Sequence, residues 1–145
     1  MTLDEKVKAM GIDIDDFSPS TTLAPATRIG NTILVSGHVS TGYQGKLGRD
    51  LDVETGKQAA RVCAIDLLKA AYTITGTVNN LRVRRLLGAV NSMPEFTDQH
   101  LVINGASELF WELYDGELHA RSALGFASLP NGFAVEIEAI FEIVE

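Results

Sequence analysis

The chain has little of three things that mark large classes of protein: cysteine, long apolar runs and positive charge. Its one cysteine, Cys63, cannot form a disulfide within the chain, which fits a reducing compartment. No apolar run approaches the roughly 18 residues of a membrane-spanning helix, and residues 1–11 are charged, unlike the apolar centre of a signal peptide. The sequence therefore predicts a cytoplasmic protein without a membrane segment.

Basic residues are outnumbered by acidic ones. The 12 Lys and Arg face 19 Asp and Glu, which gives a net charge of -7 and a pI near 4.9. Proteins that follow a phosphate backbone normally carry the opposite balance, so we expect no nucleic acid partner. The neighbouring Arg82, Arg84 and Arg85 are more simply explained as a solvated strand face or as an ion pair between subunits.

What the chain does have is enough apolar material for one core. With 145 residues, 46% of them hydrophobic, a single domain over residues 1–145 is the expected organisation. Residues 2–5 have the form of a capping box and Gly11 offers a stop, which predicts a short helix inside an N-terminal extension over residues 1–25. Within this extension, residues 18–22 form an extended connector.

After this extension, hydrophobic periodicity predicts the element order ββαβαββ. Asp52 is placed to cap the first long helix and Gly76 to end it. In chain order, the predicted elements are two strands within residues 26–39 that meet at a Gly30-Asn31 turn, a helix from Asp52 to Thr75, a strand over 81–90, a helix over 97–114, and strands within 120–130 and 135–140.

Strands interrupted by two long amphipathic helices predict the fold class α+β, with a mixed sheet covered by helices on one face. Cys63 lies on the apolar side of the first long helix, where a thiol packs as a small apolar group and stays protonated. The other face of the sheet then carries apolar side chains with nothing over them. Because large apolar surfaces are rarely left in water, we expect the chain to form an oligomer through this open face.

The C-terminal part brings an arginine and two carboxylates into neighbouring strands. Arg121 lies in one strand-like run and Glu136 and Glu138 lie in the next, which predicts that all three lie near one sheet surface. An isolated arginine in such a place favours binding of an anion. An ion pair between the arginine and one of the carboxylates, across the two strands, is the alternative.

Four motifs follow one another along the chain: GNTILVSG at residues 30–37, RS at 121–122, ASLP at 127–130 and VEIEAI at 135–140. In this combination they closely resemble the RidA family, also called the YjgF or endoribonuclease L-PSP family. The resemblance covers about residues 25–143 in matching order, so it is far more specific than one short pattern.

The resemblance implies a chorismate-mutase-like α+β fold assembled as a homotrimer, with three small-molecule sites in clefts between neighbouring subunits. It implies hydrolysis of reactive 2-imino or enamino acids to 2-oxo acids and ammonium. The implied partners are a small carboxylated metabolite and further copies of the chain. It implies no metal or organic cofactor, because an iminium carbon already hydrolyses readily and positioning contributes most of the acceleration.

The resemblance also assigns roles to residues. Arg121 matches the arginine that holds the substrate carboxylate, a task that suits a planar guanidinium with two parallel charge-assisted hydrogen bonds. Glu136 matches the glutamate associated with the attacking water, as a general base. Ser36 and Gly37 match residues that line the cleft, and Asn104 matches a pocket asparagine. Without the resemblance, Ser36 and Gly37 would be a strand end with tight backbone approach, and Asn104 an ordinary exposed helix residue.

Two further cleft positions depart from the family pattern. Leu23 stands where well-studied deaminases carry a pocket tyrosine, and Ala123 stands where they carry a cysteine after the Arg-Ser pair. If only the backbone carbonyl of the cysteine contacts the ligand, Ala123 retains that atom. The departure at Leu23 leaves the identity of the substrate open.

Metal and nucleotide chemistry have weak support in the sequence. His38, His100 and His119 have no ligand-like spacing, so no metal site is expected and each is interpreted as a surface or subunit-contact residue. The glycines at 42, 45 and 48 suit a surface loop and lack the spacing of a phosphate-binding loop.

Two other functions stay open. In one, the trimer is a binding module that senses a carboxylated metabolite without converting it, which the departure at Leu23 permits. In the other, the protein cleaves RNA or represses translation, as the names of some relatives suggest, although the acidic charge disfavours this. Arg121 alone fits a catalyst and a sensor equally well.

Overall fold

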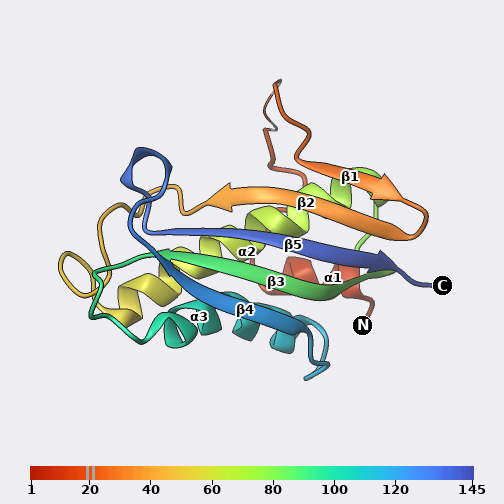
Figure 1. The fold of residues 1–145 in the computed structure, drawn as a ribbon. Helices are drawn as coiled ribbons and strands as arrows, with labels where there is room; N and C mark the ends of the chain where they lie inside the picture. Colours follow the sequence, from red (N-terminus) through yellow and green to blue (C-terminus); the bar gives the residue numbers. More distant parts are fainter. Residues whose placement is uncertain (19, 21) are drawn as a thin grey trace.

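A five-stranded mixed sheet with helices against one face forms the framework of the chain (Figure 1). The computed structural model describes residues 1–18, 20 and 22–145, so the predicted connector over residues 18–22 lies partly outside the described residues. The predicted order ββαβαββ and the α+β class are confirmed. The strands are β1 (Ala26–Ile29), β2 (Thr32–Val39), β3 (Leu81–Asn91), β4 (Ala120–Phe126) and β5 (Val135–Ile143). The helices are α1 (Leu3–Ala9), α2 (Val53–Thr75) and α3 (Gln99–Leu113), with a 3-10 turn, η1, at Pro130–Gly132.

The order of the strands in the sheet is β1-β2-β5-β3-β4, so β1 and β4 form its two edges. β3 and β4 are parallel, whereas the other neighbouring strands are antiparallel. Parallel neighbours need a crossover that returns the chain to the same end of the sheet, and α3 supplies it. The crossover places α3 behind β4, the strand that carries Arg121 (Figure 1).

Helices begin and end where the sequence places their caps. The side chain of Asp52 accepts a hydrogen bond of 2.8 Å from the amide of Thr55 at the start of α2, and Gly76 ends this helix with φ at 70°. At the start of α1, Thr2 and Glu5 complete a reciprocal capping box. These caps confirm the predicted starts of both helices and the predicted end of α2.

The core lies between the sheet and the two long helices. Phe110 of α3 meets Phe141 of β5 edge to face, with ring centroids 5.9 Å apart. The predicted apolar positions of the helices are fully buried, with the exception of Ile74, which is only partly buried. They are Ala60, Cys63, Ala64, Leu67, Leu68 and Ala71 in α2 and Val102, Ala106, Leu109, Phe110 and Leu113 in α3.

No helix in the described part of the chain has the length and apolar content needed to cross a bilayer.

The other face of the sheet has no helix over it in the described part of the chain (Figure 1). Leu34 on β2 and Leu124 on β4 are 39% and 47% exposed on this side. Leu34 pairs with Ile140 of β5, and the row continues to Arg85 of β3, so the apolar side chains of this face lie beside charged ones. An apolar sheet face of this kind favours contact with another protein surface.

Two of the three arginines of the basic cluster on β3, Arg82 and Arg84, are paired with carboxylates within the chain. Arg84 donates hydrogen bonds of 2.8 Å to both Glu117 and Glu142. The guanidinium of Arg82 lies over the ring of Tyr114, 5.3 Å from its centroid. These contacts are made inside one chain, whereas Arg85 has only a long contact of 3.5 Å with Ser122 Oγ among the described residues. An ion pair of Arg85 with another subunit stays a prediction.

Gly105 lets α3 lie directly against α2. A methyl group at this position would overlap the carbonyl oxygen of Lys57, a backbone atom that cannot rotate away. We therefore expect Gly105→Ala to lower the free energy of unfolding by about 2 to 3 kcal/mol in urea denaturation, although alanine is the better helix former by about 1 kcal/mol.

Gly56→Ala is the matched control for this prediction. At Gly56 the nearest atom to an added methyl group is the end of the Leu47 side chain, at 2.9 Å, which can move aside. The loss at Gly56 should be clearly smaller than the loss at Gly105. Unchanged stability of Gly105→Ala would contradict the close backbone contact between the helices.

Candidate functional site

Arg121 lies near the start of β4 and points toward α3. Its pairing partner on β3, Leu86, is fully buried, so the alternation of the sheet directs both side chains to the helix-covered face. The Nη1 group of Arg121 donates to Asn104 Oδ1 at 2.7 Å and to Ser107 Oγ at 3.1 Å, and both acceptors lie on α3. Two acceptors on one helix fix the plane of the guanidinium.

The remaining edge of the guanidinium is much less engaged. Nη2 has one long contact, 3.4 Å from the carbonyl oxygen of His100. Within residues 1–18, 20 and 22–145, Nε of Arg121 has no hydrogen-bond partner, and no carboxylate lies within ion-pair distance. Partial burial lowers the pKa of Arg121, yet arginine stays charged at neutral pH. Its Nε/Nη2 edge therefore has the donors to take a carboxylate with two parallel hydrogen bonds, in place of the long contact with His100.

Two residues beside this arginine, Ser107 and His119, were given no role at the site from the sequence. Ser107 is fully buried, and its Oγ lies 2.9 Å from His119 Nε2. His119 is half-buried and stacks on Trp111, so it makes contacts within the chain that the sequence did not indicate, and a subunit contact stays a prediction. Asn104 and Ser107 are three residues apart and so share a helix face, a signal that points from the predicted asparagine to the serine.

Glu136 lies on the open face of the sheet. Its neighbours Val135 and Ile137 are fully buried, so the alternation of β5 directs the carboxylate away from the helices. On β2, Gly37 lies against it: a methyl group at Gly37 would come within 2.6 Å of Glu136 Oε2. The missing side chain at Gly37 therefore makes the room in which the carboxylate lies.

Leu23, Ser36 and Gly37 line one cavity of about 340 Å³ beside the edge formed by β1 and β2. Ser36 Oγ donates to the carbonyl oxygen of Ala24 at 2.7 Å, which ties the segment before β1 to β2. Asp66 of α2 also lines the cavity, and burial raises the pKa of its carboxyl. Leu23 is 71% exposed, so this side of the cavity is open to contact from outside the chain.

Arg121 and Glu136 lie on opposite faces of the sheet. The expectation that Arg121, Glu136 and Glu138 lie near one sheet surface is therefore wrong, and so is the alternative of an ion pair across the strands of one chain. The reason is the register through β3, which places Arg121 level with the buried Ala139, one residue out of step with both glutamates.

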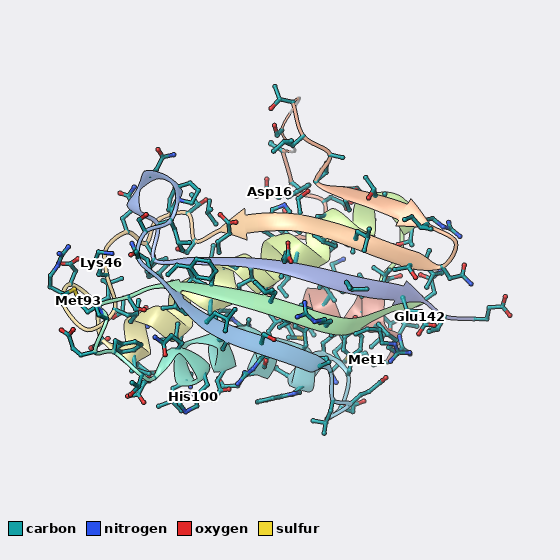
Figure 2. All side chains as sticks on the ribbon, viewed as in Figure 1. Met1, Asp16, Lys46, Met93, His100 and Glu142 are labelled. Atoms are coloured by element: carbon teal, nitrogen blue, oxygen red, sulfur yellow. The ribbon has the colours of Figure 1, made fainter. Side chains whose placement is uncertain are left out.

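The predicted site residues thus form two groups on opposite faces of the sheet, one on the edge strand β4 and on α3, the other on the central strand β5, on β2 and before β1. In Figure 2, His100, whose carbonyl oxygen contacts Arg121, lies at α3 below the sheet, whereas Asp16, which lines the second cavity, lies above β2, on the side of the sheet where β1 runs. Three strand spacings of about 4.8 Å, roughly 14 Å in all, separate β2 from β4. The arginine group is Arg121, Asn104 and the partly buried Ala123, and the glutamate group is Glu136, Gly37, Ser36 and Leu23.

A larger cavity, of about 580 Å³, holds none of the predicted site residues. Its one charged side chain is Lys46, whose Nζ donates to Asn91 Oδ1 at 2.7 Å and to the carbonyl oxygen of Ala127. These bonds tie the segment after β4 to the end of β3. Because its ammonium group already serves this structural contact, we place the candidate site at Arg121 and not in the larger cavity.

Comparison with known proteins identifies the class to which this architecture belongs. Residues 13–143 match the sequence model of the family Endoribonuclease L-PSP. The chain belongs to this family, which confirms the resemblance drawn from the four motifs.

Three relatives show the extent of the similarity. The chain is 42% identical over 102 residues to Protein TCP17 of Trypanosoma cruzi, a match that covers 68% of this chain and 64% of that protein. The crystal structure of Atu1372, a protein of unknown function from Agrobacterium tumefaciens, is 38% identical with a TM-score of 0.85, covering 97% of this chain and 92% of that one. E. coli TdcF, solved with bound serine, is 20% identical with a TM-score of 0.56, covering 89% and 91%, and shows a shared fold alone.

Cys63 is buried in α2 with its thiol 3.6 Å from the carbonyl oxygen of Val135. Burial raises the pKa of Cys63 well above its usual range, so the nucleophilic thiolate is scarce. We expect no reaction of the native protein with a chromogenic thiol reagent at neutral pH, and one equivalent of reaction after unfolding in guanidinium. Rapid labelling of the folded protein would contradict this burial and would make Cys63 a candidate nucleophile.

Proposed function

We propose that the chain is a hydrolytic deaminase of small 2-imino or enamino acids, which it converts to 2-oxo acids and ammonium. The observation that carries the proposal is the free Nε/Nη2 edge of Arg121, on a guanidinium held by Asn104 and Ser107. A 2-imino acid offers a carboxylate to this edge and carries its reactive carbon one bond away. Membership of the family supports the proposal, as does the serine bound to TdcF, in which a carboxylate likewise neighbours a nitrogen-bearing carbon.

Glu136 is proposed as the group that activates water. The substrate reacts as its protonated form, the iminium: the water oxygen bonds to the iminium carbon, the π electrons of the C=N bond move to nitrogen, and Glu136 accepts one proton of the water. Glu136 then protonates the amino nitrogen of the carbinolamine. The C–N bond breaks as the C=O bond forms, and the departing ammonia takes the hydroxyl proton and leaves as ammonium. Holding both reactants in place contributes most of the acceleration.

The complete site is proposed to form between two copies of the chain. The arginine group and the glutamate group lie on opposite faces of one sheet, so in this proposal the arginine group of one copy meets the glutamate group of the next. A closed ring such as the homotrimer implied by the resemblance provides one such cleft for each copy. The open sheet face, with Leu34 and Leu124, offers the copies an apolar surface to bury.

A trimer that binds a carboxylated metabolite without converting it is the second candidate, and Leu23 favours it. At this position the family's deaminases carry a tyrosine, whereas Leu23 has no hydroxyl to offer a water molecule or the imine nitrogen. Cleavage of RNA is not proposed, because the net charge of -7 opposes binding to a polyanion.

Substitution of Arg121 tests the carboxylate anchor. Arg121→Lys keeps the charge but loses the two parallel hydrogen bonds, so we expect kcat/KM for freshly generated 2-aminoacrylate to fall by about 100-fold. Arg121→Ala should lower it further. The rate is measured by coupling the 2-oxo acid product to its reduction by a dehydrogenase.

Arg49→Ala is the control, because Arg49 is an exposed arginine paired with the adjacent Asp50, remote from both groups in the sheet. Its rate should equal that of the unchanged protein. Full activity in both Arg121 variants would contradict the role of Arg121 as the group that binds the carboxylate. Binding of 2-oxobutanoate by the unchanged protein, without turnover of any imine, would instead support the second candidate, a protein that binds a carboxylated metabolite without converting it.

Mixed assemblies test whether the site is shared between copies. Arg121→Ala and Glu136→Gln should each be nearly inactive alone, because each removes one group from every cleft. When the two variants are unfolded together and refolded in equal amounts, about one quarter of the clefts should combine an intact arginine group with an intact glutamate group. Activity should therefore return to about a quarter of the original. No recovery in mixtures that demonstrably contain both chains would show that the groups do not cooperate across an interface.

A further inference from the structure

Ser107 connects Arg121 to a histidine that has no role in the reaction proposed above. Its Oγ accepts a hydrogen bond of 3.1 Å from Arg121 Nη1 and lies 2.9 Å from His119 Nε2. Ser107 is fully buried on α3, and His119 is half-buried just before β4. Three side chains thus form a chain of contacts that runs from the candidate ligand edge into the protein.

The single hydroxyl proton of Ser107 indicates which nitrogen of His119 carries a proton. Arg121 is a donor only, so it cannot accept that proton. In the described part of the chain, His119 Nε2 is the one other group bonded to Ser107 Oγ. The hydroxyl therefore donates to an unprotonated Nε2, which leaves the proton of the neutral imidazole on Nδ1. Nδ1 is buried and has no hydrogen-bond partner among the described residues, so the contact with Ser107 is the ring's one polar tie.

We propose that Ser107 and His119 are positioning residues for Arg121, and that neutral His119 holds the guanidinium in the orientation that presents its Nε/Nη2 edge to a carboxylate. The proposal deepens the function proposed above and rests on Arg121 as the carboxylate anchor. Its consequence is that acid weakens binding of the carboxylate, because protonation of His119 removes the acceptor for the Ser107 hydroxyl.

The surroundings of His119 keep the ring neutral at physiological pH. From α3 it is faced by Ser107 and by the rings of Phe110 and Trp111, none of which is charged, and from β4 by Arg121. Burial, followed by the positive charge of Arg121, lowers the pKa of His119 from its usual 6.5. The positioned state is therefore complete above pH 6.5 and is lost as the pH falls through the lowered pKa.

Protonation changes the contacts of Ser107 in a defined way. An imidazolium carries a proton on both nitrogens, so Nε2 becomes a donor. Ser107 Oγ then faces two donors, Arg121 Nη1 and His119 Nε2, while its own proton loses its acceptor. Two positive groups then share one buried oxygen, which weakens the bond of Ser107 to Nη1 and leaves Asn104 as the main acceptor that orients the guanidinium.

Binding of 2-oxobutanoate, measured by calorimetry between about pH 8 and about pH 5, tests the proposal, because the ligand stays ionised over this range. We expect affinity for the unchanged protein to fall about 10-fold toward the acid end. His119→Gln should bind within about threefold of the unchanged protein at pH 8, because glutamine can accept the hydroxyl proton, and should lose the acid dependence. Ser107→Ala should bind more weakly at every pH, also without the acid dependence. Glu112→Gln, an exposed carboxylate on the same helix, should behave as the unchanged protein does.

A measurement without ligand separates this proposal from the proposed function. In NMR spectra of the free protein, the Nε–H signal of Arg121 should shift with the titration of His119, and Ser107→Ala should reduce this shift to the part caused by the direct interaction of the two charges. If no carboxylate binds at any pH while this Ser107-dependent shift is present, the proposed function fails and the positioning role stands. An Arg121 signal that ignores His119, or an acid dependence of binding that survives in His119→Gln, would overturn the positioning role.

Discussion

The parallel pairing of β3 with β4 sets the position of the other parts of the candidate site. A parallel neighbour cannot be reached by a tight turn, so the chain has to cross behind the sheet, and α3 is that crossover. The crossover leaves β4 as an edge strand with a helix directly behind it. Asn104 and Ser107 can hold Arg121 only because this helix runs along that edge. The orientation of the guanidinium is thus a consequence of strand direction.

The two faces of the sheet divide the chemistry between them. The helix-covered face carries the cation, with neutral acceptors that orient it and do not cancel its charge. The open face carries Glu136, which fits against β2 only because Gly37 has no side chain. Separation by the sheet keeps the two charges from pairing within one chain, so each remains available to a ligand. An ion pair between them would satisfy both groups and leave nothing for a substrate.

Much of the fold could be predicted from the sequence because its signals are local. Asp52, Gly76 and the Thr2–Glu5 box act within one helical turn, and the apolar stripes of α2 and α3 follow a period that any helix must keep. The face that Arg121 occupies could not be predicted in this way. Strand alternation shows which residues of one strand share a side, but the relation between β4 and β5 depends on the register through β3. His119 was missed for a similar reason, since its partner lies on a different element.

Sharing of the site between copies, as proposed above, would have a consequence for how such a protein behaves when it is scarce. A half-site on an isolated chain would be inert, so activity would follow the association equilibrium as well as the number of chains. Below the dissociation constant of the assembly, specific activity would fall steeply with dilution. Above it, activity would be proportional to the amount of protein. Such a protein would respond to its own concentration with a threshold.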